Sequence, residues 1–126
     1  MPQDKPVVVI TGAAGNIGRR LRKALSRRYR VIGLDRPDGA ERDETMIGFD
    51  LTDSASVERA IDELRQTVGE HIASVIHLAA YFDFSGEERP QYKSVNEDGT
   101  RNLLRALQKL DVTQFVYSGT MLVHAA

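Results

Sequence analysis

The sequence contains no cysteine, so it can form neither a disulfide framework nor a thiolate metal site. A cysteine-free chain suits a reducing compartment, and we expect a cytoplasmic location. No apolar run approaches the ~20 residues that span a bilayer. Residues 1–6 also lack the apolar stretch of a signal peptide. We therefore expect no membrane partner and no metal site.

Neither sign of charge is in excess, because 17 basic and 18 acidic side chains give a formal net charge of −1. A balanced chain has no strong overall field to attract nucleic acid or an anionic surface. Lys and Arg do gather between Arg19 and Arg30, but acidic residues dominate the positions that follow. We interpret this basic run as the solvated face of a helix and expect no nucleic-acid partner.

The chain of 126 residues has the size of one domain, and we treat residues 1–126 as one. Short apolar runs alternate with amphipathic stretches, a pattern typical of βαβ units and of a parallel sheet covered on both faces. The expected strands lie near residues 7–11, 30–34, 46–49, 74–79 and 114–118. Right-handed crossovers would arrange them in the order 3-2-1-4-5. The expected fold is therefore α/β, with a Rossmann-type doubly wound parallel sheet.

Three helices are expected between these strands. The apolar stripe of the first consists of Ile17, Leu21, Ala24 and Leu25. The second should begin after Asp53, a favourable N-cap residue, and end at Gly69. The third should follow Pro90. In this fold ligands bind at the carboxyl ends of the strands, beside the first and the fourth.

A glycine-rich turn joins the first strand to the first helix, with the sequence Thr-Gly-Ala-Ala-Gly-Asn-Ile-Gly over residues 11–18. Gly12 would let the backbone turn, Gly15 has no Cβ to block a phosphate, and Gly18 would let the helix approach the strand. Free N–H groups at the start of the helix would then meet a negative charge. A purely structural βα turn is the alternative. The residues predicted to hold a diphosphate are Gly12, Ala14, Gly15, Asn16, Ile17 and Gly18.

An acidic residue, Asp35, ends the second strand about twenty residues further on. Its carboxylate can accept both hydrogen bonds from an adenosine ribose, which favours NAD because a 2′-phosphate would be repelled. Arg36 follows directly and could hold that phosphate if Asp35 swung aside, so NADP stays open as the second choice. An ordinary acidic loop residue is the remaining alternative.

The spacing of the glycines in residues 11–18 resembles that of the short-chain dehydrogenase/reductase superfamily. Two further elements, His-Leu-Ala-Ala at 77–80 and Asn-x-x-Gly-Thr at 96–100, are similar to those of its extended, epimerase/dehydratase branch. The resemblance implies that Asp50 and Leu51 contact the adenine ring. The alternative is that Asp50 only helps to start the following helix.

The same resemblance implies a role for the ends of the fourth and fifth strands. Small side chains there leave room for the centre of the cofactor, at Leu78, Ala79 and Ala80. His77 is expected to be a packed strand residue rather than a catalyst, because no carboxylate nearby in the sequence would orient it. Thr120 would hydrogen-bond the substrate oxygen, with Ser118 nearer the cofactor; simple loop hydroxyls are the alternative.

On the third helix the resemblance implies that Asn96 supports the active site, or is an ordinary helical residue, and that Gly99 lets the helix lie close to its neighbour. After Thr120 the sequence departs from the family pattern, which continues with an aromatic residue and a glycine.

The family's Tyr-x-x-x-Lys pair, in which the Lys lowers the pKa of a proton-exchanging Tyr, does not occur in these 126 residues. We therefore expect the amino-terminal part of a longer enzyme, with a sheet incomplete at its carboxyl-terminal side. Such a part should bind cofactor without turnover and self-associate, or exchange strands, through uncovered edges.

The resemblance implies an NAD-dependent epimerase, dehydratase or related oxidoreductase that transfers hydride. Its small-molecule substrate would be a sugar, a nucleotide sugar or a similar secondary alcohol. Two alternatives remain: a non-catalytic redox sensor or regulatory protein that binds the dinucleotide, and an interaction module that has lost the ligand.

Overall fold

The computed structural model describes residues 5–13, 15–36, 45–78 and 90–117. Strands and helices alternate along the chain, as the periodicity predicts. The elements are β1 (Val7–Thr11), α1 (Asn16–Leu25), β2 (Arg30–Asp35), β3 (Met46–Gly48), α2 (Ser54–Val68), β4 (His71–His77), α3 (Pro90–Leu107) and β5 (Asp111–Tyr117).

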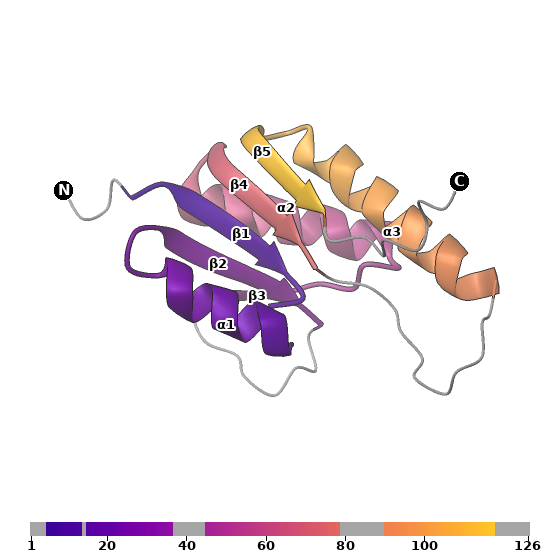
Figure 1. The fold of residues 1–126 in the computed structure, drawn as a ribbon. Coiled ribbons are helices and arrows are strands. Elements are labelled where there is room, and N and C mark those ends of the chain that lie inside the picture. Colours follow the sequence, from indigo (N-terminus) through magenta and orange to yellow (C-terminus); the bar gives the residue numbers. More distant parts are fainter. Residues whose placement is uncertain (1–4, 14, 37–44, 79–89, 118–126) are drawn as a thin grey trace.

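The five strands form one parallel sheet in the order β3-β2-β1-β4-β5, which confirms the predicted Rossmann-type topology. Figure 1 shows α1 on one face of this sheet and α2 and α3 on the other. Strands β2 and β3 lie on one side of β1 in the sheet, and β4 and β5 lie on the other side. In register, Thr11 pairs with Leu34 of β2 and with His77 of β4. The ends of the three central strands therefore lie side by side at one edge.

Strands β4 and β5 both begin earlier than their apolar runs predict. They start at His71 and Asp111, whereas the apolar residues suggested starts near 74 and 114. These two polar residues pair across the strands, with His71 Nδ1 2.9 Å from Asp111 Oδ2. The Asp111 N–H also donates to the Glu70 carbonyl at 2.7 Å. Backbone pairing thus extends each strand into polar sequence that hydrophobicity does not mark.

The larger part of the core lies between the sheet and the helices α2 and α3. Its fully buried side chains include Val9, Leu34, Phe49, Ile61 and Leu103. A smaller cluster under α1 consists of Val8, Ile10 and Ala13, with partly buried side chains packed on it. Both faces of the sheet are therefore covered, as a parallel sheet requires.

The predicted apolar stripe of α1 is partly wrong. Ile17 is 65% exposed and Ala24 is also exposed, whereas Leu21 and Leu25 pack on the smaller cluster as expected. The one buried residue of α1 is Gly18. The start of α1 lies against the turn through Gly18, and Leu21 and Leu25 pack on the cluster beneath, so Ile17 is left facing solvent.

The ends of α2 are those predicted. Asp53 is the N-cap and its Oδ1 accepts a hydrogen bond from the Ala55 N–H at 3.0 Å. Gly69 ends the helix with a φ of +89°. Just after α3, the Lys109 ammonium contacts the carboxylates of Asp62, at 2.7 Å, and Glu58. These hydrogen bonds raise the pKa of Lys109 and join the two helices. Within the described ranges, no helix is long and apolar enough to cross a bilayer.

Candidate functional site

The glycine-rich turn contains two glycines that the fold itself requires. Gly12 has a φ of +72°, in the left-handed region, and its N–H donates to the Leu34 carbonyl at 2.8 Å. A Cβ on Gly18 would collide with the Gly12 carbonyl oxygen and lie 2.8 Å from the Ala13 Cα. The predicted roles of Gly12 in the turn and of Gly18 in helix packing are therefore confirmed.

Gly15 differs from both, because the fold does not require a glycine there. Its φ is −73°, which any residue adopts, and a Cβ would lie 3.4 Å from the Gly12 carbonyl oxygen, an ordinary contact. The residue is exposed and is the N-cap of α1. Among the described residues no side chain caps the start of this helix, and its first turn carries no acidic residue. The N–H groups at the start of α1 are therefore suited to an anion, as a phosphate site requires.

Asp35 and Arg36 lie at the end of β2, beside this turn. Asp35 is half-buried, and its Oδ1 accepts a hydrogen bond from the Arg36 N–H at 2.7 Å; Arg36 is exposed. Two residues before Asp35, Gly33 brings β2 close to the turn, since a Cβ on it would lie 2.5 Å from the Ala13 Cβ and 2.5 Å from the Met46 Sδ. Gly33 was not predicted from the sequence, although a glycine inside a strand often marks such a close approach.

Asp50 takes part in the turn that leads into α2. Its Oδ1 accepts hydrogen bonds from the Thr52 N–H at 3.0 Å and from the Thr52 hydroxyl at 2.7 Å. Its own N–H donates to Ser56 Oγ at 2.8 Å. Asp50 therefore does help to start the following helix, which was the structural alternative for this residue. The carboxylate remains on an exposed residue, and its contact with adenine stays a prediction, as does that of the neighbouring Leu51.

A buried polar chain joins the ends of β1 and β4 to α3. Thr11 Oγ1 lies 2.6 Å from His77 Nδ1, and His77 Nε2 lies 3.0 Å from Thr100 Oγ1. Thr11 Oγ1 also accepts from the Leu78 N–H at 3.0 Å. The Tyr117 ring stacks on the imidazole at 5.5 Å between centroids. Both ring nitrogens are used within the fold, so His77 is a packed strand residue, as expected.

Burial lowers the pKa of His77 to about 4, because the charged imidazolium would lose its hydration. The ring is 1% exposed and therefore neutral at pH 7. The threonine partners were missed from the sequence because Thr11 and Thr100 are far from His77 along the chain. The available signal was a polar residue, Thr11 or His77, as the last residue of each of two apolar strands.

Several predicted site residues lie outside the described part of the chain, and their roles stay predictions. They are Ala14, Ala79, Ala80, Ser118 and Thr120. Asn96 belongs to α3, but only its backbone is described. Within the part of the chain that the structure describes, no three His, Asp or Glu side chains gather to hold a metal ion.

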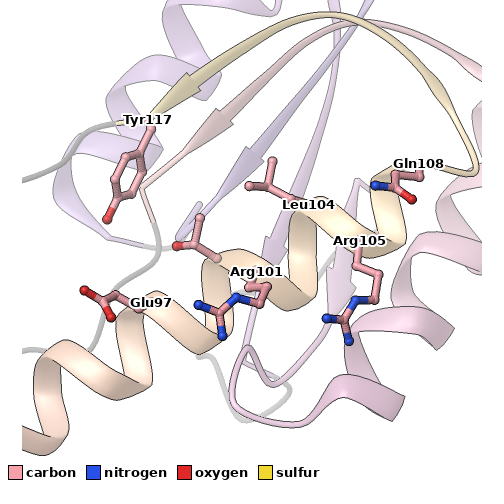
Figure 2. Close-up of a pocket in the computed structure, with 7 residues that line it drawn as sticks. Glu97, Arg101, Leu104, Arg105, Gln108 and Tyr117 are labelled. Atoms are coloured by element: carbon pink, nitrogen blue, oxygen red, sulfur yellow. The ribbon is translucent and has the colours of Figure 1, made fainter.

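An open groove of about 580 Å³ runs along α3 and the end of β5 (Figure 2). Its lining is partly charged and partly apolar. The lining residues are Glu97, Thr100, Arg101, Leu104, Arg105, Gln108 and Tyr117. Figure 2 shows Tyr117 extending from the end of β5 on the side of Glu97. Leu104 is 45% exposed and Tyr117 54%, so this surface leaves large apolar groups in water.

A parallel sheet with this strand order, and an uncapped glycine-rich turn between β1 and α1, define a Rossmann-type α/β domain. The family follows from the comparison of sequences. The sequence model of the NAD dependent epimerase/dehydratase family matches residues 8–125, and the chain belongs to this family, within the short-chain dehydrogenases/reductases.

Similar proteins come from animals and bacteria. Short-chain dehydrogenase/reductase family 42E member 1 of Mus musculus is 37% identical over 120 residues, which are 90% of this chain and 29% of the relative. A 3-beta-hydroxysteroid dehydrogenase of Mycolicibacterium neoaurum is 32% identical over 117 residues, 90% of this chain and 31% of the relative. The chain thus spans under a third of either relative's length.

A solved structure from Agrobacterium tumefaciens, a short-chain dehydrogenase/reductase superfamily protein with bound NAD, superimposes with a TM-score of 0.67. It is 29% identical, and the match covers 90% of this chain and 32% of that chain.

Proposed function

We propose that this chain binds NAD(H) across the carboxyl ends of β1, β2 and β3, as the dinucleotide-binding part of an oxidoreductase or epimerase. The diphosphate lies at the start of α1, and the adenosine ribose at Asp35. The observation that carries the proposal is Gly15. A glycine stands where neither φ nor packing against the described residues needs one, at the exposed end of a helix that no described side chain caps.

The pairing of strands supports the path of the cofactor. The Gly12 N–H bonds to Leu34 of β2, one residue before Asp35, so the turn and the acidic side chain are neighbours. The N–H of Phe49 donates to the Asp35 carbonyl at 2.8 Å, so the segment after β3 lies next to the end of β2. Diphosphate, ribose and base would thus follow the order β1, β2, β3 along one edge of the sheet.

In the whole protein, bound NAD would accept hydride from a secondary alcohol. We propose a nucleotide sugar or a similar alcohol as the substrate, and the hydroxysteroid dehydrogenase relative supports a steroid alcohol as an alternative of the same chemistry. Ser118 and Thr120 would meet the reacting oxygen. The 126 residues contain no Tyr-x-x-x-Lys pair, so we expect them to bind cofactor without turnover. The lack of cysteine supports a reducing, cytoplasmic location.

Calorimetric titration with NAD and NADP tests the proposal. We expect NAD to bind at least about tenfold more tightly than NADP, because the Asp35 carboxylate repels a 2′-phosphate. Asp35→Ala should lower the affinity for NAD about tenfold, close to the ~1.5 kcal/mol lower end for a hydrogen bond to a charged group, and bring the two affinities together.

The matched control is Asp111→Ala, which removes an exposed carboxylate at the first residue of β5, where the strands begin. It should leave both affinities unchanged. A folded chain that binds neither dinucleotide would overturn the proposed function. Tighter binding of NADP than of NAD would instead assign the ribose site to Arg36.

We also propose self-association through the free side of β5. This strand pairs with β4 and with no other strand in the described ranges. On this strand Val116 is 39% exposed and Tyr117 54%, and Leu104 of α3, which lines the same groove as Tyr117, is 45% exposed. Light scattering should give an average mass that rises with protein concentration. A constant monomer mass over a hundredfold range of concentration would contradict this.

A further inference from the structure

α3 touches the segment after β3 through a glycine. A Cβ built on Gly99 would lie 2.6 Å from Leu51 Cγ and 2.8 Å from Leu51 Cδ2. Gly99 is buried, and Leu51 is half-buried against the main core. The missing Cβ therefore gives the Leu51 side chain the space that it occupies.

Thr100, the next residue of α3, is held by a hydrogen bond to the end of β4. Thr100 Oγ1 lies 3.0 Å from His77 Nε2, at the end of β4. One turn of α3 thus contacts both the connection after β3 and the end of β4. Thr100 anchors the helix, so Leu51 is backed by a part of α3 that cannot easily move away.

The base of the proposed cofactor would come to this connection. Asp35, the proposed ribose ligand, is hydrogen-bonded through its carbonyl to Phe49, two residues before Leu51. A base attached to that ribose and directed away from the phosphates continues past β2 and meets the segment after β3. Leu51 is the apolar side chain there, next to the exposed carboxylate of Asp50.

We propose that Gly99 is a positioning residue for the adenine end of the dinucleotide and that it acts through Leu51. This inference rests on the proposed function. Gly99 leaves space for the Leu51 side chain to lie below the base, and the hydrogen bond of Thr100 to His77 holds α3 in that position. A methyl group at 99 would push Leu51 outward by about 1 Å to restore ordinary contact distances of ~3.5–4.0 Å. Leu51 would then stand in the space of the base.

The test is a double-variant cycle measured by calorimetric titration with NAD and with ADP-ribose. Gly99→Ala should lower both affinities about tenfold. Leu51→Ala alone should lower them only about threefold, because apolar contact with the base is lost but its space stays open. The double variant Gly99→Ala/Leu51→Ala should match Leu51→Ala within about twofold, because the added methyl group no longer has a side chain to displace.

A glycine at the far edge of the sheet provides the control. Gly69 has a φ of +89° and free space around its missing Cβ, and it lies between α2 and the start of β4. Gly69→Ala should therefore lower the melting temperature through backbone strain while leaving both affinities unchanged. A merely structural role for Gly99 would give the same outcome as this control, with lower stability and unaltered affinity in the folded fraction, and would overturn the inference.

If Gly99→Ala does not fold, Leu51→Ala still tests whether the Leu51 side chain lies against the base, as the inference requires. Nicotinamide 1,N6-ethenoadenine dinucleotide has a wider base than NAD, so removal of the Leu51 side chain should raise its affinity relative to NAD at least threefold. An unchanged ratio would overturn the inference. If the unmodified chain binds no NAD, the proposed function itself fails; if it binds NAD and the variants do not alter affinity, only the role of Gly99 fails.

Discussion

Gly15→Ala should weaken the binding of NAD about a hundredfold, or ~2.7 kcal/mol, and leave the fold intact. The protein has room for the methyl group, since its nearest described heavy atom would be the Gly12 carbonyl oxygen at 3.4 Å. A diphosphate that reaches the N–H groups of α1 must pass over this position, and a Cβ would hold it away. The substitution would therefore lower the affinity for NAD, while the free energy of unfolding would change by at most ~1 kcal/mol, a typical effect at an N-cap.

The same turn supplies a comparison, because Gly18→Ala should lower the stability of the fold as well as the affinity for NAD. Its Cβ would collide with backbone atoms of Gly12 and Ala13, which cannot turn aside as a side chain can. Overpacking of this kind costs about 1–3 kcal/mol. Urea unfolding and calorimetry on both variants separate the two effects. Unaltered NAD affinity in a folded Gly15→Ala protein would show that the turn is structural and that its exposed glycine serves no phosphate.

The sequence predicts the architecture well because local signals agree with one another. Asp53 and Gly69 mark the ends of α2, and apolar runs mark the cores of five strands. Given strands separated by helices, right-handed crossovers leave few arrangements of a parallel sheet, and the observed order is the expected one. Of the site, the residues predictable by position are those at strand ends and in the turn, such as Gly12, Gly18 and Asp35.

The rest of the site depends on contacts between residues far apart in the sequence. His77 meets Thr11 across 66 residues and Thr100 across 23. Gly99 meets Leu51, and Gly33 meets Met46, through close approaches that only the packed structure reveals. The exposed position of Ile17 has the same origin. Helical periodicity gives the spacing of a stripe, but the contact through Gly18 decides which way the stripe faces.

Buried His77 should make the stability of the domain depend on pH. The pKa of its imidazole is lowered to about 4 in the fold, whereas it is 6.5 in the unfolded chain. As pH falls below 6.5 the unfolded chain takes up a proton that the folded chain does not accept until about pH 4. The free energy of unfolding should therefore decrease by about 3 kcal/mol between pH 7 and pH 4 from this residue alone, and the contribution should level off below pH 4.

Urea unfolding of the wild-type chain and of His77→Gln, at pH 7, 5.5 and 4.5, isolates this effect from the titration of carboxylates, which both proteins share. The variant should be the less stable protein at pH 7, because glutamine does not reproduce the hydrogen bonds of His77 to Thr11 and Thr100. Glutamine does not titrate, so position 77 of the variant adds no pH dependence. The difference between the two proteins should then shrink steadily as the pH falls, because only the wild type must keep an imidazole unprotonated among Thr11, Thr100 and the Tyr117 ring. A difference that stays constant from pH 7 to 4.5 would mean that the imidazole takes up its proton inside the fold as readily as outside it, and the buried polar chain would then not hold the ring neutral.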